Sequence, residues 1–111
     1  MVYTPFPSAE GSTSGTTTAS YVTAVSIDMT GYRNCLILIK NGDGSSTMYA
    51  KVDGYANQAG TLSNADSAEG SIAAGATEAI VLDGKTRAKY VVSVKNNSGV
   101  CAYSLEYIKG N

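Results

Sequence analysis

The sequence of 111 residues contains no histidine and no tryptophan, and it has only two cysteines. Without histidine, the chain lacks the commonest general base near neutral pH, the Ser-His-Asp and Cys-His nucleophile systems, and every histidine-containing zinc site. Two thiolates cannot complete a tetrahedral zinc site, and no CxxC spacing occurs. Glycine motifs that cradle phosphate are also missing. We therefore predict a protein that is not an enzyme and needs no metal or other cofactor.

Charge is scarce as well. Charged residues make up 15% of the chain, and eight Lys and Arg against nine Asp and Glu give a formal charge of −1. Binding to nucleic-acid phosphates or to anionic lipid needs a concentrated basic surface. We therefore expect neither nucleic acid nor a membrane as a partner.

The sequence shows no basic start followed by an apolar run, and no apolar stretch of membrane-spanning length. We predict no signal peptide. An extracellular location stays open, because a virion component made in a host cytoplasm is released by lysis and needs no such signal.

Small and polar residues dominate what is present. Serine, threonine, glycine and alanine are abundant, and the aromatic residues are eight tyrosines and one phenylalanine. This composition disfavours long amphipathic helices. Tyrosine is the one compositional signal for function, because it buries a large ring while its hydroxyl stays available to a partner.

Alternation of apolar and polar residues predicts strands separated by turns. The stretch Cys35–Ile39 is apolar throughout, so we expect a central strand that is covered on both sides. Residues 41–46 are turn formers and predict a hairpin. Residues 56–76 are expected to form a long surface connection with one short strand at most. The predicted strands span 21–28, 32–40, 48–56, 77–82, 88–95 and 100–108.

These strands, with no helix pattern between them, predict an all-β fold. We expect an antiparallel β-sandwich or jelly roll of about six to eight strands over residues 20–111. A parallel sheet would need crossover helices, which the pattern does not provide.

Residues 1–19 are predicted to form an extended or flexible N-terminal arm. They hold both prolines, Pro5 and Pro7, followed by a Gly/Ser/Thr run. Within the arm, Tyr3, Pro5 and Phe6 form a short apolar cluster that is a candidate docking peptide. An ordinary frayed terminus is the alternative explanation.

Two tyrosines of the domain are further candidates for partner binding. Tyr49 and Tyr55 flank Lys51 and Asp53, and they suit either the core or contact with a partner or a sugar ring.

The remaining reactive groups have structural explanations. Cys35 and Cys101 are in phase with core residues, so two buried thiols are favoured over a disulfide. The nine carboxylates are scattered, and no sequence-local pair predicts a general acid and base. Asp43 and Asp83 lie in turns that lack the further acidic positions of a calcium loop. No catalytic residue is predicted, and a small-molecule ligand is not expected.

A shared pattern extends over residues 26–108. It consists of a strand that ends at Asp28 and is followed by GYRN, a lysine-asparagine hairpin, the strand AGATEAIVL, and YVVSVKNNSG leading into a final aromatic strand. In these features the chain resembles small β-sandwich structural proteins of tailed bacteriophages, of the head decoration or cement type. The resemblance implies a virion protein that binds the outside of the capsid lattice, often as a homotrimer, and stabilises it. The arm would then reach a neighbouring subunit.

Two other classes stay open. A carbohydrate-binding module or tail-fibre-like adhesin would use Tyr32, Tyr49 or Tyr55 to stack on a sugar ring. A small hydrolase would need two carboxylates about 5 to 10 Å apart in a cleft.

Overall fold

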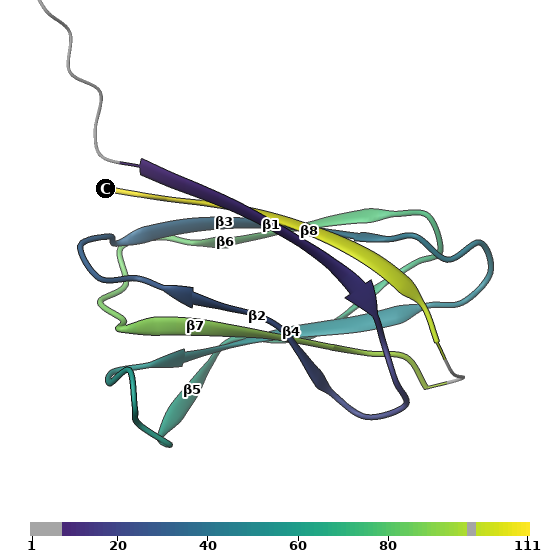
Figure 1. Cartoon of the computed structure of the whole chain (residues 1–111), viewed down its shortest axis with the longest axis horizontal. Helices are drawn as coiled ribbons and strands as arrows, with labels where there is room; N and C mark the ends of the chain where they lie inside the picture. Colours follow the sequence, from purple (N-terminus) through teal and green to yellow (C-terminus); the bar gives the residue numbers. More distant parts are fainter. Residues whose placement is uncertain (1–7, 98–99) are drawn as a thin grey trace, which may run out of the picture.

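Eight antiparallel strands form two four-stranded sheets that pack face to face (Figure 1). This computed structural model describes residues 8–97 and 100–111. The strands are β1 (Ser8–Thr16), β2 (Val22–Asp28), β3 (Asn34–Asn41), β4 (Met48–Tyr55), β5 (Ser63–Ile72), β6 (Thr77–Leu82), β7 (Lys89–Lys95) and β8 (Ala102–Gly110). The described residues contain no helix, and hence none that could span a membrane. The prediction of an all-β antiparallel sandwich is confirmed.

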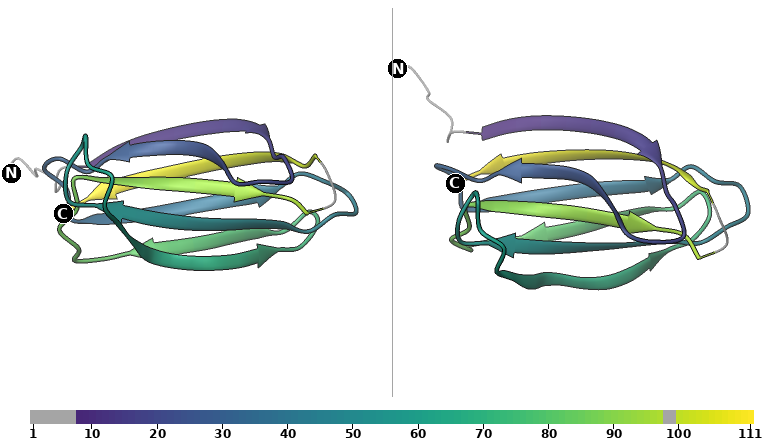
Figure 2. Two further views of the ribbon diagram at one scale, coloured as in Figure 1. Left: turned by 90° about the horizontal axis from the view of Figure 1, so that it is seen from below. Right: turned by 60° about the horizontal axis from the view of Figure 1, so that its bottom comes forward.

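The strand order identifies the sandwich as a jelly roll. One sheet runs β1-β8-β3-β6 and the other runs β2-β7-β4-β5. The first strand therefore pairs with the eighth, the second with the seventh, the third with the sixth and the fourth with the fifth. This nested pairing is that of a long hairpin rolled into the two layers that Figure 1 shows edge-on, and Figure 2 views the same sandwich onto its sheets.

The core lies between the two sheets and is built from alternate residues of each strand. Its largest fully buried side chains are Ile27, Met29, Ile37, Ile39, Met48, Val52, Ile72, Leu82, Tyr90, Val92, Val94 and Leu105. Cys35 and Cys101 are free thiols buried in the same core. Burial raises the pKa of Cys35 to about 11, so its thiol stays protonated and behaves as a small apolar group.

Strand β3 is central, as predicted, but only one of its faces is covered within the chain. Cys35, Ile37 and Ile39 are buried, whereas Leu36 is half-buried and Leu38 is exposed. The expectation of cover on both sides is therefore wrong for the described chain. The physical reason is that a two-layer sandwich has one interior, and an antiparallel sheet leaves its other face to solvent.

Strand β5 replaces much of the connection that was expected over residues 56–76. It has ten residues and pairs with β4, with register shifts around Val52. Its side chains are mostly small or polar, and Ile72 is the one apolar residue of the strand that is buried. Backbone hydrogen bonds to β4 hold this edge strand in place, so it does not need apolar side chains at alternate positions. The sequence pattern that predicts a strand is therefore weak here.

Strand β1 lies in the segment that was expected to be an N-terminal arm. It pairs with β8 along its whole length, from Ser8 opposite Gly110 to Thr16 opposite Ala102. Residues 8–16 therefore belong to the sandwich, and the sheet begins well before the boundary expected near Ser20. Residues 1–7, with Tyr3, Pro5 and Phe6, lie outside the described residues.

Two glycines allow β1 to pack on β8. Gly11 lies opposite Tyr107, and Gly15 lies opposite Tyr103. A Cβ on Gly15 would be 2.8 Å from the Tyr103 hydroxyl, and one on Gly11 would be 2.6 Å from Cε1 of Tyr107 and closer still to Cζ. Each tyrosine ring therefore fills the space that the opposing glycine leaves, an arrangement that compensates for the weak strand propensity of glycine.

Buried asparagines join the loops at the end of the sandwich where β3 ends and β4 begins. The Asn41 amide donates to the carbonyls of Ser46 (2.8 Å) and Ile72 (3.0 Å), and its Oδ1 accepts from the Asp43 N–H (2.9 Å). Asn96 donates to the Thr47 carbonyl at 2.7 Å. Because these side chains are fully buried, their hydrogen bonds fix the loops on both sheets.

We expect Gly11→Ala to lower the free energy of unfolding by about 1–2 kcal/mol, because the added methyl group collides with the Tyr107 ring. Urea denaturation measures the change. Gly70→Ala is the matched control: Gly70 is also a strand glycine, but a Cβ there would meet nothing within 4 Å. An equal or smaller loss for Gly11→Ala than for Gly70→Ala would contradict this account of β1.

Candidate functional site

The outer surface of the β1-β8-β3-β6 sheet is apolar at its centre. Leu36 lies between Ile108 of β8 and Val81 of β6, and Leu38 lies between Glu106 and Ala79 in the next row. Leu38 is 36% exposed, Ile108 41% and Val81 61%. We call this surface the leucine face and define its apolar centre as Leu36, Leu38, Ala79, Val81 and Ile108.

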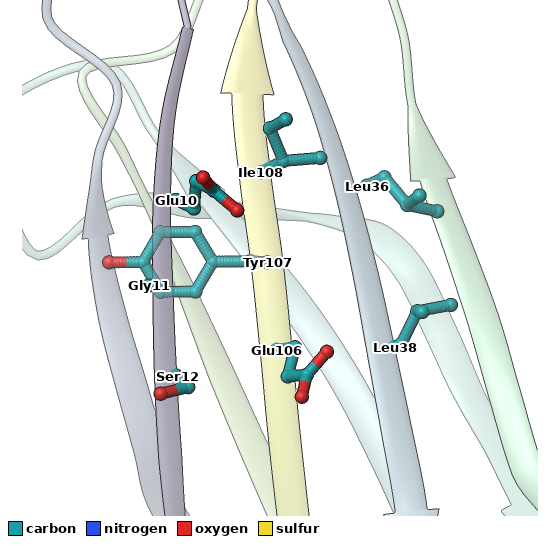
Figure 3. Close-up of a pocket in the computed structure, with 8 residues that line it drawn as sticks. All are labelled: Glu10, Gly11, Ser12, Leu36, Leu38, Glu106, Tyr107 and Ile108. Atoms are coloured by element: carbon teal, nitrogen blue, oxygen red, sulfur yellow. The ribbon is translucent and has the colours of Figure 1, made fainter.

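A shallow hollow of about 510 Å³ occupies part of the leucine face (Figure 3). It extends from β1 across β8 to β3, and Gly11 and Ser12 of β1 place little side-chain bulk at its end away from the leucines. Its lining consists of Glu10, Gly11, Ser12, Leu36, Leu38, Glu106, Tyr107 and Ile108. The hollow is thus an apolar floor with two carboxylates beside it.

The two carboxylates of the hollow, Glu10 and Glu106, lie on adjacent strands. Glu10 is opposite Ile108, two residues along β8 from Glu106, so the pair is diagonal, with a typical separation of about 7–8 Å. This is within the spacing that a two-carboxylate hydrolase needs. Both glutamates are exposed on an open sheet surface, however, whereas a general acid is made by an enclosing apolar environment. Glu10 and Glu106 thus have the spacing of a hydrolase pair but lack the enclosing cleft that would make one of them a general acid.

The outer surface of the opposite sheet is polar and is built from tyrosines and lysines. Tyr49 and Tyr55 are both half-buried on the outward side of β4. The Lys95 ammonium lies 5.8 Å from the Tyr49 ring centre, and that of Lys89 lies 4.8 Å from the centre of Tyr55. These cation–π contacts occupy one side of each ring. We call this surface the tyrosine–lysine face.

Tyr21 extends the tyrosine–lysine face beside β7. Lys51 and Lys95 lie 4.5 Å and 4.8 Å from its ring centre, and its hydroxyl donates a hydrogen bond to Glu69. Burial, with the hydrogen bond and charge of Glu69, raises the pKa of Tyr21 above its ordinary value. The hydroxyl therefore stays protonated as a donor to the carboxylate.

The charges of the two faces are arranged differently. On the tyrosine–lysine face, Lys51 lies 3.8 Å from Asp53, and Lys95 lies 3.7 Å from Glu69. On the leucine face, Glu10, Lys40 and Glu106 form no ion pair with any residue in the described part of the chain. Charged side chains of the tyrosine–lysine face thus form ion pairs among the described residues, whereas Glu10, Lys40 and Glu106 of the leucine face do not.

A buried ion pair joins β5 to the turn before β7. Arg87 donates to the two Asp66 oxygens at 2.6 and 2.7 Å, and the Asp66 side chain is fully buried. Gly54 makes room for the pair, because a Cβ there would be 2.5 Å from Arg87 Nε. The Arg87 hydrogen bonds hold the pKa of Asp66 below its usual range. Neither group lines the leucine-face hollow, so we assign the pair a structural role.

The aspartates of the turns act as hydrogen-bond acceptors. Asp43 Oδ2 accepts from the backbone N–H groups of Ser45 (3.0 Å) and Ser46 (2.7 Å), which lowers the pKa of Asp43. Asp28 Oδ1 accepts from the Thr30 N–H at 2.9 Å. Turn formation therefore explains Asp43, and residues 8–97 and 100–111 bring together no group of three metal-ligating side chains.

The predicted site residues and the leucine face do not coincide. Tyr49 and Tyr55 lie on the opposite sheet, and the arm candidates lie outside the described residues. The leucine face was missed because the sequence shows that residues 35–39 are apolar but not how many layers the fold has. Val81 and Ile108 join Leu36 only through long-range strand pairing.

Comparisons with known proteins show the fold. No known protein family and no curated protein matches the sequence. Among solved structures, a protein of the Bacillus endospore appendages that form disulfide-linked pili aligns with a TM-score of 0.63 at 10% identity, covering 95% of this chain and 88% of that chain. The SPBc2 prophage-derived protein YomS aligns with a TM-score of 0.62 at 16% identity, covering 97% and 98%.

A third similar structure is the mitogen derived from Yersinia pseudotuberculosis, with a TM-score of 0.60 at 16% identity, covering 89% of this chain and 84% of that chain. At these identities the likeness establishes the sandwich fold alone. The similar folds include a prophage-derived protein and a pilus protein.

We expect Asp66→Asn to lower the free energy of unfolding at pH 7 by about 2–3 kcal/mol, because Arg87 then loses its counter-charge. A carboxyl whose pKa is depressed by folding stabilises the protein above its ordinary pKa, and this stabilisation is lost as the pH falls through the folded-state pKa. Urea denaturation between pH 7 and pH 2 should therefore give a shallower acid slope for the variant. Arg87→Met should flatten the slope in the same way, and an unchanged slope in both variants would contradict the pairing.

Proposed function

We propose that this protein is a non-enzymatic structural protein of a virion, which binds the outside of a phage capsid and decorates or stabilises it. The observation that carries the proposal is the leucine face, where Leu36, Leu38, Val81 and Ile108 stand together on a sheet surface that nothing in the described chain covers. Contiguous exposed apolar surface is characteristic of protein contact sites.

The physical logic is that of repeated contact. Burying apolar surface contributes about 25 cal/mol for each Å² removed from water, so a small face gives one copy only modest affinity. A lattice offers many equivalent positions, and copies that are also linked to one another gain avidity. The resemblance to decoration proteins implies a trimer on such a lattice, with an arm that reaches a neighbour.

The comparisons support a structural role at a coarser level. The similar folds include a prophage-derived protein and a protein of appendages that form pili. Both support the view of a sandwich that works through contact. The proposal of a location on the capsid surface follows from the same reasoning.

A carbohydrate-binding or adhesin module is the second candidate. The observation in its favour is that Tyr49 and Tyr55 lie on the outward side of one strand and are only half-buried. A sugar ring would have to compete with the lysines that already lie over these rings. We therefore rank this function below the structural role.

Leu38→Asp should reduce binding to capsids at least about tenfold, because it places a charge at the centre of the apolar face. Purified protein is mixed with expanded, undecorated capsids of the phage that encodes it, and co-sedimentation and the capsid disruption temperature are measured. The wild type should bind and raise that temperature.

Leu62→Asp is the matched control, since Leu62 is 88% exposed in the β4–β5 loop, away from the leucine face, and should behave as wild type. A wild-type protein that neither binds the capsids nor raises their disruption temperature would remove the proposal.

For the adhesin alternative, we expect the wild type to bind nothing on a glycan array. Binding that is lost in Tyr49→Ala and kept in Tyr49→Phe would instead favour stacking on a sugar, because phenylalanine retains the aromatic ring. The unfolding midpoint of each variant shows whether a loss of binding comes from a loss of fold.

A further inference from the structure

We propose that the leucine face is covered by the same face of a second copy of this chain, in a two-fold symmetric dimer. This inference rests on the proposed function in one respect, namely that the protein acts through contact at this face. The second copy and the capsid compete for the face, so the dimer is the free form of the protein and separates when the face binds a capsid subunit. What it adds is the identity of the occupant: another sandwich, seated sheet on sheet.

Exposed apolar side chains concentrate on this surface. Among the described residues, the large hydrophobic side chains that are exposed are Leu38, Leu62, Val81, Val100 and Ile108. Three of these five lie together on the leucine face, while Leu62 and Val100 lie in separate loops. The rows Ile108–Leu36–Val81 and Leu38–Ala79 form a continuous stripe across three strands. A flat stripe of this kind suits another flat sheet, because two sheets pack through their side chains about 10 Å apart.

The area is adequate for a specific but weak dimer. Four strands at a spacing of about 4.8 Å, each about 26 Å long, present roughly 500 Å². Two such faces together remove about 1,000 Å² from solvent, which is the lower bound for a specific interface. We therefore expect an equilibrium between monomer and dimer that depends on concentration, with small-residue positions of the edge strand β1, such as Ser12, at the rim.

The charges of the face select a copy of the same chain. Lys40 and Glu106 lie on neighbouring strands, one row apart, and a small hollow of about 180 Å³ lies between them. Neither forms an ion pair within residues 8–97 and 100–111. A two-fold axis that passes through this hollow places Lys40 of each copy opposite Glu106 of the other, because each contact of a two-fold dimer occurs twice. A partner of a single charge sign would leave one of these groups facing a like charge.

Glu10 fits the same arrangement. It lies on β1, the edge strand of the sheet, where a dimer rim stays in water. Its unpaired carboxylate can therefore remain hydrated, while Glu106 on the adjacent inner strand is matched across the interface. On the tyrosine–lysine face, Lys51 and Lys95 already form ion pairs with Asp53 and Glu69, so these two lysines do not need a partner from another copy.

Sedimentation equilibrium of the full-length protein tests the proposal, over about two orders of magnitude in concentration within the micromolar range. We expect the wild type to pass from monomer to dimer, and Leu38→Asp to weaken the dimer at least about tenfold. Leu62→Asp, the same substitution on an exposed leucine of a loop, should dimerise as the wild type does. Circular dichroism checks that Leu38→Asp is folded. A wild type that is monomeric or trimeric throughout, or dimerisation that survives Leu38→Asp, overturns the proposal.

A charge exchange tests the symmetry. Lys40→Glu and Glu106→Lys should each weaken the dimer about fivefold, because each places like charges opposite one another twice. The double variant Lys40→Glu/Glu106→Lys restores opposite charges and should recover most of the affinity. Lys85→Glu, in the β6–β7 turn, is the matched control and should leave the dimer unchanged. Failure of the double variant to recover would contradict the two-fold pairing of Lys40 with Glu106.

The two proposals fail separately. A monomeric wild type whose capsid binding is lost in Leu38→Asp would show that this face meets a capsid subunit, which overturns the dimer and leaves the virion role. A dimer that breaks with Leu38→Asp but does not bind capsids supports the inference and removes the virion role.

Discussion

In a two-layer sandwich, alternate side chains of a strand point into the core and the rest point outward. The contacts that this protein can make depend on the side chains that point outward. The inward set is conventional: isoleucine, valine, leucine, methionine and two tyrosines, Tyr90 and Tyr103, fill the space between the sheets together with smaller residues. Within residues 8–97 and 100–111 the outward set has no further layer to meet, because these residues form two sheets of four strands and the turns between them. The outward side chains of one sheet can therefore differ in polarity and charge from those of the other sheet.

The two outward surfaces differ in how they are satisfied. On the tyrosine–lysine face, ammonium groups lie over aromatic rings and against carboxylates, so polar and aromatic atoms find partners within the chain. On the leucine face, Leu36 lies between Ile108 and Val81. Leu38 lies between Ala79 and the unpaired carboxylate of Glu106, and all four neighbours are exposed to water. A monomer in isolation gains nothing from that arrangement, since hydrating this surface is unfavourable. The leucine face is therefore the surface from which we expect contact with another protein.

The apolar run at residues 35–39 predicted β3, and the other strand patterns predicted β2, β4, β6, β7 and β8; the ends of all six fall within two residues of the expected ranges. It failed for β1 and β5, because edge strands of small residues are held by backbone pairing and carry little hydrophobic signal. The spacing of Gly11 and Gly15 matches that of Tyr103 and Tyr107, and this was the one available sign of β1. Surface chemistry was harder still. The sequence left Tyr49 open between the core and an outward contact, and the lysine over its ring comes from β7, which only the register brings opposite it.

The pairing of β1 with β8 has a consequence for synthesis on the ribosome. The segment that forms β1 is made early, yet its hydrogen-bonding partner is the last strand of the sandwich to emerge. Glycine and serine give β1 little structure of its own, so it stays unpaired while the other strands are made. The sandwich can close only when β8 has left the exit tunnel, so its first strand is among the last to be fixed.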